Sequence, residues 1–227
     1  MDTLLEILSK ITAAKVISKE IAYSDYIEID LSETNDFLKT KNLETSADYE
    51  LFIQNYLDIN KAKIAYGGYK EVRNLYKRSV VFNNSDSDER NIHIGLDLWI
   101  NETAPVYAAL DGKIHSFQYN DSLGDYGPTL ILEHNINGIN FHTLYGHLSL
   151  DSLKDKAIGD EMKKGIQIAT LGLPPINGDY APHLHFQIIV NMENKKGDYP
   201  GVCNQKDLDF YSKNCPNPNL LLKIIKP

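Results

Sequence analysis

From about residue 62 onward, the sequence consists of short segments in which apolar and polar side chains alternate. The strand-like segments are KIAYGGY, SVVFN, NIHIGLDLW, PVYAALDGKIHSFQYN, PTLILEHN, INFHTLYGH and HLHFQIIV. Turn-forming stretches such as LDGK, SLGDYGP, NING and LPPINGDY separate them. No helical pattern stands between these strands, as parallel crossover connections would require. We therefore expect a mainly β fold with an antiparallel β-sheet core.

The first 60 residues have a different pattern. Apolar residues recur at helical spacing over 3–21 and over 46–60, and Ser46 is a candidate N-cap of the second helix. The segment YIEIDLS between these two stretches alternates like a short strand. The sequence thus predicts an N-terminal, mostly helical extension over residues 1–60, followed by a β domain over residues 61–227.

Charge and hydropathy limit the partners and the location. The chain has 227 residues and a formal net charge of −8, which disfavours nucleic acid and anionic membranes as partners. No apolar run approaches the roughly 18–20 residues that span a bilayer. The start, MDTLLEILSK, is acidic and lacks the apolar stretch of a secretory signal. We expect a cytoplasmic protein, or a periplasmic or extracellular one if the chain is a processed form.

The two cysteines, Cys203 and Cys215, lie near the C-terminus. A disulfide between them is one option, but a reducing compartment favours two free thiols. The oligomeric state has no signal in the sequence.

One strand-like segment, NIHIGLDLW, carries unusual chemistry on its polar face. His93 and Asp97 are four residues apart, so a straight strand places both on one side. Their Cα atoms would then be roughly 13 Å apart, too far for both side chains to reach one metal ion. A bend at Gly95 would bring them together, and glycine permits such a bend. The segment therefore indicates a folded-over pair of metal ligands.

Two further segments add histidines. His183 and His185 in PHLHFQI share a strand face, and their Cα atoms should be about 6–7 Å apart. In FHTLYGHL, a straight strand would put His147 on the same face as Tyr145. A zinc ion that catalyses hydrolysis needs three His, Asp or Glu ligands, an open position and nearby groups that move protons.

Taken together, HIGLDLW, PVYAALDGKIHSF, YGPTLILEH, TLYGHLS and PHLHFQI resemble the lysostaphin/LytM-type zinc endopeptidases, metallopeptidase family 23. The resemblance covers about residues 90–190 and follows the family order: H-x-x-x-D, a histidine in a Y-x-H segment, then H-x-H. It implies a LytM-like zinc peptidase domain over residues 61–227, with the core at 90–190. It also implies one Zn²⁺ per chain and a peptide substrate of the peptidoglycan type, which contains glycine or D-amino acids.

The resemblance also implies a role for each motif residue. His93, Asp97 and His185 correspond to the zinc ligands. His147 and His183 correspond to catalytic histidines that do not bind the metal. One of these two would take or orient the proton of the attacking water, while the other helps the tetrahedral intermediate. Thr103 stands where relatives have a turn glycine, which affects no ligand.

Two alternative functions stay open. The missing export signal favours an intracellular metallohydrolase that acts on another small peptide or amide. A non-catalytic metal-binding regulatory module is a third reading, but silent relatives typically lose a ligand. For His115, His134 and His142 we expect structural or surface roles. Tyr145 could donate a hydrogen bond into the cleft, and Trp99 is expected in the core or the cleft wall.

Overall fold

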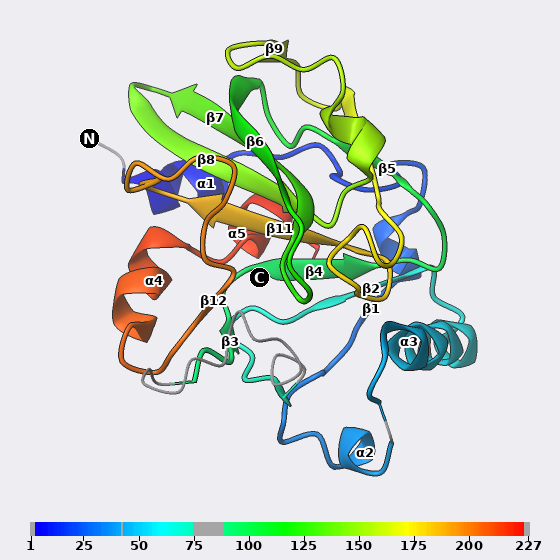
Figure 1. The fold of residues 1–227 in the computed structure, drawn as a ribbon. Coiled ribbons are helices and arrows are strands. Elements are labelled where there is room, and N and C mark those ends of the chain that lie inside the picture. The colour runs from blue at the N-terminus through cyan, green and yellow to red at the C-terminus, as the bar shows by residue number, and fades with distance from the viewer. Residues whose placement is uncertain (1–2, 42, 75–88, 225–227) are drawn as a thin grey trace.

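The computed structural model describes residues 3–41, 43–74 and 89–224, and its centre is a twisted β-sheet (Figure 1). In this described part of the chain the sheet has eight strands, in the order β1-β2-β4-β11-β8-β7-β6-β9. In chain order these are β1 (Tyr26–Glu28), β2 (Ile64–Gly67), β4 (Leu96–Trp99), β6 (Gly112–Asn120), β7 (Gly127–Ile136), β8 (Ile139–Gly146), β9 (Glu161–Met162) and β11 (His183–Ile189). Neighbours run antiparallel, except β1 and β2, which run parallel. The predicted mainly β, antiparallel fold class is confirmed.

Shorter elements surround this sheet. Two-stranded sheets pair β10 (Gln167–Thr170) with β5 (Pro105–Tyr107), and β12 (Val202–Cys203) with β3 (Ile92–His93). The α-helices are α1 (Leu4–Lys10), α2 (Asp36–Lys39), α3 (Ser46–Asn60), α4 (Leu208–Asn214) and α5 (Asn219–Leu222). The described residues also contain two 3-10 helices, η1 (Tyr23–Asp25) and η3 (Leu150–Leu153). In Figure 1, α3 lies beside the β1–β2 edge and α4 lies on the opposite side of the molecule, near β12.

The helix predicted over residues 3–21 is much shorter in the structure. It ends at Lys10, and the chain beyond it is extended. Ile17 pairs with Val106 of β5, and the carbonyl of Val16 accepts a hydrogen bond from Tyr107 N at 2.9 Å. Val16 and Ile17 are buried in the principal core. Pairing with β5 therefore outweighs the helical periodicity of this segment, which is a weak signal on its own.

The second predicted helix is confirmed as α3, but its N-cap differs. Thr45, not Ser46, caps the helix, and its side chain accepts a hydrogen bond from Asp48 N. Ser46 instead donates from Oγ to Asp179 Oδ1 at 2.8 Å, which ties the start of α3 to the loop before β11. The predicted strand SVVFN lies outside the described residues.

Strand β11 divides the interior. Leu184, Phe186 and Ile188 point into the principal core, which the residues of α1 and α5 help to close. The opposite face of β11 carries His183 and His185. The strand has β4 on one side and β8 on the other, so both histidines sit near the middle of the sheet. The alternation predicted for this segment is therefore correct.

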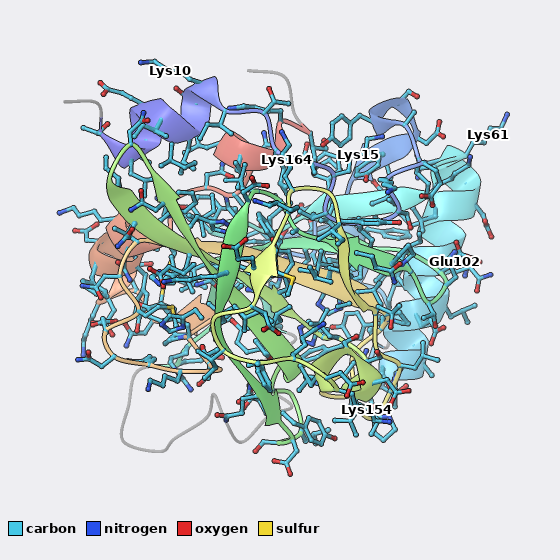
Figure 2. All side chains as sticks on the ribbon, turned by 90° about the horizontal axis from the view of Figure 1, so that it is seen from above. Lys10, Lys15, Lys61, Glu102, Lys154 and Lys164 are labelled. Atoms are coloured by element: carbon cyan, nitrogen blue, oxygen red, sulfur yellow. The ribbon has the colours of Figure 1, made fainter. Side chains whose placement is uncertain are left out.

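Most charged side chains lie at the surface, with Arg73 and Asp97 as buried exceptions. Labelled lysines such as Lys10, Lys61 and Lys154 project outward around the fold (Figure 2). Within the described ranges, every helix is too short or too polar to cross a lipid bilayer. Cys203 and Cys215 are both buried, and both are free thiols in the structure.

Candidate active site

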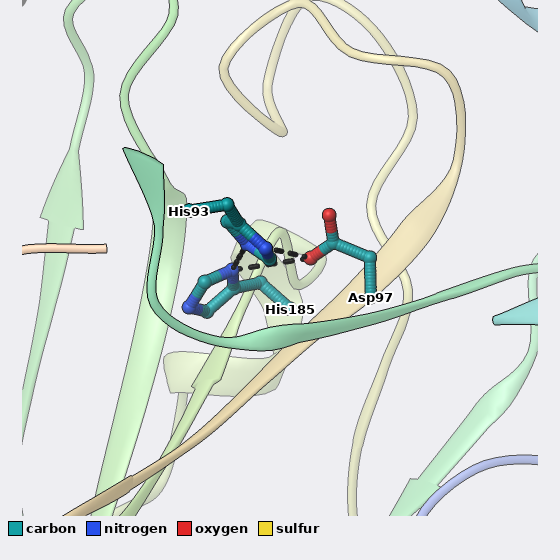
Figure 3. A group of neighbouring side chains, drawn as sticks. All are labelled: His93, Asp97 and His185. Carbon is teal, nitrogen blue, oxygen red and sulfur yellow. Dashed lines mark hydrogen bonds and ion pairs between the residues drawn. The ribbon is translucent and has the colours of Figure 1, made fainter. Parts of the chain in front are cut away.

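Three side chains converge on one point beside β11. His93 Nε2 lies 2.9 Å from His185 Nδ1 and 3.3 Å from Asp97 Oδ1, while His185 Nδ1 lies 3.1 Å from the same oxygen (Figure 3). All three side chains are at least 97% buried. Tetrahedral zinc with bonds near 2.0 Å separates its ligand atoms by about 3.3 Å. The spacing and the donor types therefore fit one zinc ion.

The predicted bend between His93 and Asp97 is present, and it divides the segment into β3 and β4. Gly95 sits at the bend. Its backbone is not in the left-handed region, so glycine's conformational freedom is not what the site uses. Instead, a Cβ on Gly95 would overlap the ring of His185. Glycine is needed there because the imidazole packs directly against the backbone.

Hydrogen bonds at the far side of each ring orient the two histidines that are candidate metal ligands. His93 Nδ1 lies 2.9 Å from the carbonyl oxygen of Gly68, which can only accept, so Nδ1 carries the proton. The lone pair of the neutral His93 ring is then on Nε2, which faces His185 and Asp97. Burial lowers the pKa of His93 to about 4, which keeps the ring neutral.

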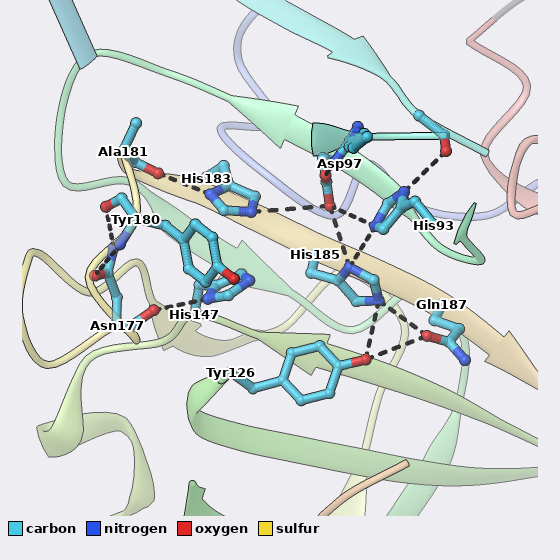
Figure 4. A network of polar contacts seen from close by, with 12 residues as sticks. His93, Asp97, Tyr126, His147, Asn177, Tyr180, Ala181, His183, His185 and Gln187 are labelled. Atoms are coloured by element: carbon cyan, nitrogen blue, oxygen red, sulfur yellow. Dashed lines mark hydrogen bonds and ion pairs between the residues drawn. The ribbon is translucent and has the colours of Figure 1, made fainter. Parts of the chain in front are cut away.

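Gln187 does the same for His185. Its amide nitrogen donates to the Pro200 carbonyl at 3.1 Å and to Cys215 Sγ at 3.2 Å, so its oxygen faces His185. That oxygen lies 2.9 Å from His185 Nε2, which therefore carries the proton and leaves the lone pair on Nδ1, the nitrogen that faces His93 and Asp97. Tyr126 Oη borders this contact at 3.4 Å from His185 Nε2 (Figure 4).

Two opposing effects act on the ionisation of the Asp97 carboxyl group: burial and the neighbouring positive charge of Arg73. Burial opposes its ionisation, but the positive charge of the Arg73 guanidinium helps to hold the pKa of Asp97 well below its usual range. Arg73 Nη1 donates to Oδ2 of Asp97 at 2.6 Å. The carboxylate is therefore ionised at neutral pH and can act as a metal ligand.

Two more histidines stand beside this cluster. His183 Nδ1 donates to the Ala181 carbonyl and His147 Nδ1 donates to the Asn177 carbonyl, both at 2.7 Å (Figure 4). Their ring centroids are 4.2 Å apart. Burial is the main cause that lowers the pKa of each, so both rings are neutral, with Nε2 as the nitrogen that can accept a proton. The pair can therefore serve in general acid–base chemistry.

His147 does not reach the site as strand alternation predicts. Tyr145 and Phe141 of β8 face the principal core, so a straight strand would bury His147 there too. Instead the chain leaves β8 after Gly146, and His147 has a φ of 61°. This left-handed backbone, held by a hydrogen bond from His147 N to Tyr126 O, turns the side chain to the other face. The predicted shared face of Tyr145 and His147 is therefore wrong.

The metal-ligand cluster and the histidine pair open into a cleft of about 310 Å³. Leu31, Tyr49 and Ile53 wall one part of it, so the N-terminal segment contributes to the site. Trp99 also lines the cleft and stacks on His183, with ring centroids 5.5 Å apart. A second part of the lining is charged and consists of Arg90, Asp125, Lys195 and Asp198.

The remaining histidines lie outside the cleft lining. His134 bonds through Nδ1 to the Asp111 carbonyl and through Nε2 to Thr143 Oγ1. His115 and His142 contact each other edge to face, with centroids 4.8 Å apart. Tyr145 directs its hydroxyl to Ala109 N and Thr143 in the core, so it donates nothing into the cleft.

Sequence reasoning missed several residues that hold the site. Gln187 could have been found from the sequence, because it lies two residues beyond His185 on β11 and so shares a strand face with His183 and His185. Arg73, Tyr126 and Asn177 had none, because each comes from a loop or a strand end that only the tertiary fold brings near. Asn177 is fully buried; its side-chain Nδ2 donates to the Tyr180 carbonyl, and its Oδ1 accepts a hydrogen bond from Tyr180 N.

The segment that holds all five predicted site residues, 91–197, matches the model of peptidase family M23. These residues belong to peptidase family M23. The match confirms the resemblance found in the sequence and the enzyme class it implied, a zinc metallopeptidase, which is a hydrolase. The individual roles of the five residues stay a prediction.

Solved structures similar to this chain include two of lysostaphin from Staphylococcus simulans. Its catalytic domain is 25% identical over 74% of this chain and 99% of its own, with a TM-score of 0.40. The antimicrobial peptidase lysostaphin is 27% identical over 53% of this chain and 44% of its own, with a TM-score of 0.35. A zinc-containing peptidase from Vibrio cholerae is 27% identical over 55% of this chain and 36% of its own, with a TM-score of 0.33. This chain thus spans less than half the length of the second lysostaphin structure and of the Vibrio cholerae peptidase. No curated protein matches its sequence.

Proposed function

We propose that this M23 chain is a zinc-dependent endopeptidase that cleaves peptides of the peptidoglycan type, with glycine or D-amino acids at the cleaved bond. The observation that carries the proposal is the convergence of three buried ligand atoms within 3.3 Å of one another, each with its lone pair free for a metal. The substrate class rests on the family match.

His93, Asp97 and His185 would hold the ion. When bound, zinc polarises a carbonyl group and lowers the pKa of a water molecule. The two ligand histidines need no deprotonation to bind it. His93 Nδ1 already carries the proton and donates to Gly68 O, and His185 Nε2 does the same to Gln187 Oε1. The site is therefore set up for a divalent ion before the ion arrives.

His147 and His183 supply the proton chemistry. Each keeps its Nδ1 proton on a backbone carbonyl, so the ring is fixed and Nε2 is the working atom. One ring can take a proton from the attacking water at Nε2. The other, once protonated, can donate a hydrogen bond to the oxygen that gains negative charge in the tetrahedral intermediate. Tyr180 contacts both rings and restricts their movement. Its ring centroid lies 4.9 Å from that of His147 and 5.8 Å from that of His183.

The test is hydrolysis of defined peptides. Purified protein is incubated with pentaglycine and with a muropeptide that contains D-alanine, and the products are identified by mass spectrometry. We expect cleavage of an internal bond, loss of activity after dialysis against a chelator, and recovery with added Zn²⁺. Cleavage of another small peptide or amide alone would favour the alternative metallohydrolase function. Metal binding without hydrolysis of any peptide in a library would indicate the non-catalytic module.

A further inference from the structure

A buried arginine sits behind the candidate metal site. Arg73 is 1% exposed, and its guanidinium lies over the Trp99 ring at 5.4 Å from the centroid. Its Nη1 donates to Asp97 Oδ2 at 2.6 Å. A charged group is costly to bury unless it is paired, so a fully buried arginine at this place has its position set by its carboxylate partners.

The two oxygens of Asp97 have different tasks. Oδ1 faces His93 and His185, and Oδ2 points away from them (Figure 3). A free carboxylate can bind a metal ion through one oxygen or through both. We propose that Arg73 is a positioning residue that occupies Oδ2 and so restricts Asp97 to one metal-binding oxygen. This inference rests on the proposed function.

Glu71 holds the arginine in turn. Arg73 Nε donates to Glu71 Oε2, and Glu71 Oε1 accepts a hydrogen bond from Leu31 N at 3.0 Å. The guanidinium thus bridges two carboxylates in a fork geometry that a lysine ammonium does not reproduce. Because Leu31 also lines the cleft, the line of contacts runs from the N-terminal segment through Glu71 and Arg73 to Asp97.

The local backbone admits this arrangement. Gly68 has a φ of 101°, and a Cβ there would overlap the Arg73 guanidinium. The carbonyl oxygen of the same glycine accepts a hydrogen bond from His93 Nδ1. One residue therefore orients a ligand histidine and leaves room for the arginine.

The experiment compares the parent with Arg73→Gln, Arg73→Lys and Glu71→Gln. Zinc affinity is measured by competition with a chromogenic chelator, and Co²⁺-loaded protein gives a visible spectrum that reports coordination number. For Arg73→Gln we expect about 10- to 100-fold weaker zinc binding, the usual range for a lost partner of a metal ligand. We also expect weaker Co²⁺ absorption, because Asp97 then binds through both oxygens and raises the coordination number. Arg73→Lys and Glu71→Gln should show smaller changes in the same direction.

Lys113→Gln is the matched control for a lost positive charge. Lys113 pairs with Glu133 on the surface, far along the sheet, and its loss should leave both readouts unchanged. Circular dichroism checks that each variant is folded. If Arg73→Gln does not fold, Arg73→Lys, which keeps the buried positive charge, serves as the test variant. A folded Arg73 variant with parental affinity and spectrum overturns the inference. Tighter zinc binding by Arg73→Gln also overturns it, because the arginine would then act only by repelling the ion. A parent that binds no metal overturns the proposed function itself.

Discussion

His183 approaches Asp97 without reaching it: its Nε2 lies 3.9 Å from Oδ1. His185, two residues further along the same strand, places Nδ1 3.1 Å from that oxygen. The two rings also present different nitrogens to the site, since His183 binds a carbonyl through Nδ1 and His185 binds Gln187 through Nε2. Adjacent inward positions on β11 thus present different ring nitrogens, which fits the proposed division between proton transfer and metal binding.

This difference predicts opposite results for two alanine variants. His183→Ala should keep zinc and lose about 10²- to 10⁴-fold in kcat, the usual contribution of a general acid or base. His185→Ala should lose the metal. Zinc content and peptide hydrolysis are measured on both proteins in parallel. Equal retention of zinc by the two variants would contradict the division of roles.

A second prediction concerns Gly95. Gly95→Ala should weaken zinc binding by about 10-fold or more, because the new Cβ displaces the ring of His185 from its ligand position. Gly138→Ala is the control: Gly138 has a φ of 82° and no atom near its Cβ position, so backbone strain alone lowers the free energy of unfolding, by about 1 kcal/mol. Zinc titration and urea denaturation separate these effects. If Gly95→Ala binds zinc as tightly as the parent, the close approach of His185 is not required.

A third prediction tests the N-terminal segment. Ile53 of α3 is 3% exposed, packs in a cluster with Trp99 and lines the cleft. Ile53→Ala should lower the free energy of unfolding by about 2–4 kcal/mol. Ile59→Ala on the same helix, where the side chain is 80% exposed, should change it by less than about 0.5 kcal/mol. Equal effects in urea denaturation would mean that α3 does not pack against the sheet as described.

Much of the site's location could be predicted from the sequence. Strand alternation puts His183 and His185 on one face, and a bend is the simplest way to bring His93 to Asp97. The position of His147 could not be predicted this way, because a single residue with positive φ reverses the direction of its side chain. Arg73 is 24 residues before Asp97 in a segment with no motif, and only the fold brings them together.

The same limit explains the errors in the fold. Strands with clear alternation, such as β7, β8 and β11, were predicted correctly, because one face of each meets the core. The helix predicted over 3–21 failed beyond Lys10, because residues 16 and 17 pair with β5 and no local signal encodes that partner. The division into residues 1–60 and 61–227 stays a prediction. Strand β1 joins the principal sheet beside β2, so the N-terminal segment is part of the same sheet.

The most direct test of the account is the zinc content of the purified protein beside two histidine variants. The parent and His115→Ala, a control outside the cleft, should each contain about one zinc per chain, and His93→Ala should contain almost none. Elemental analysis after dialysis against excess Zn²⁺ and removal of free metal gives the answer. Equal zinc in the parent and His93→Ala, or no zinc in the parent, would contradict the proposed metal centre.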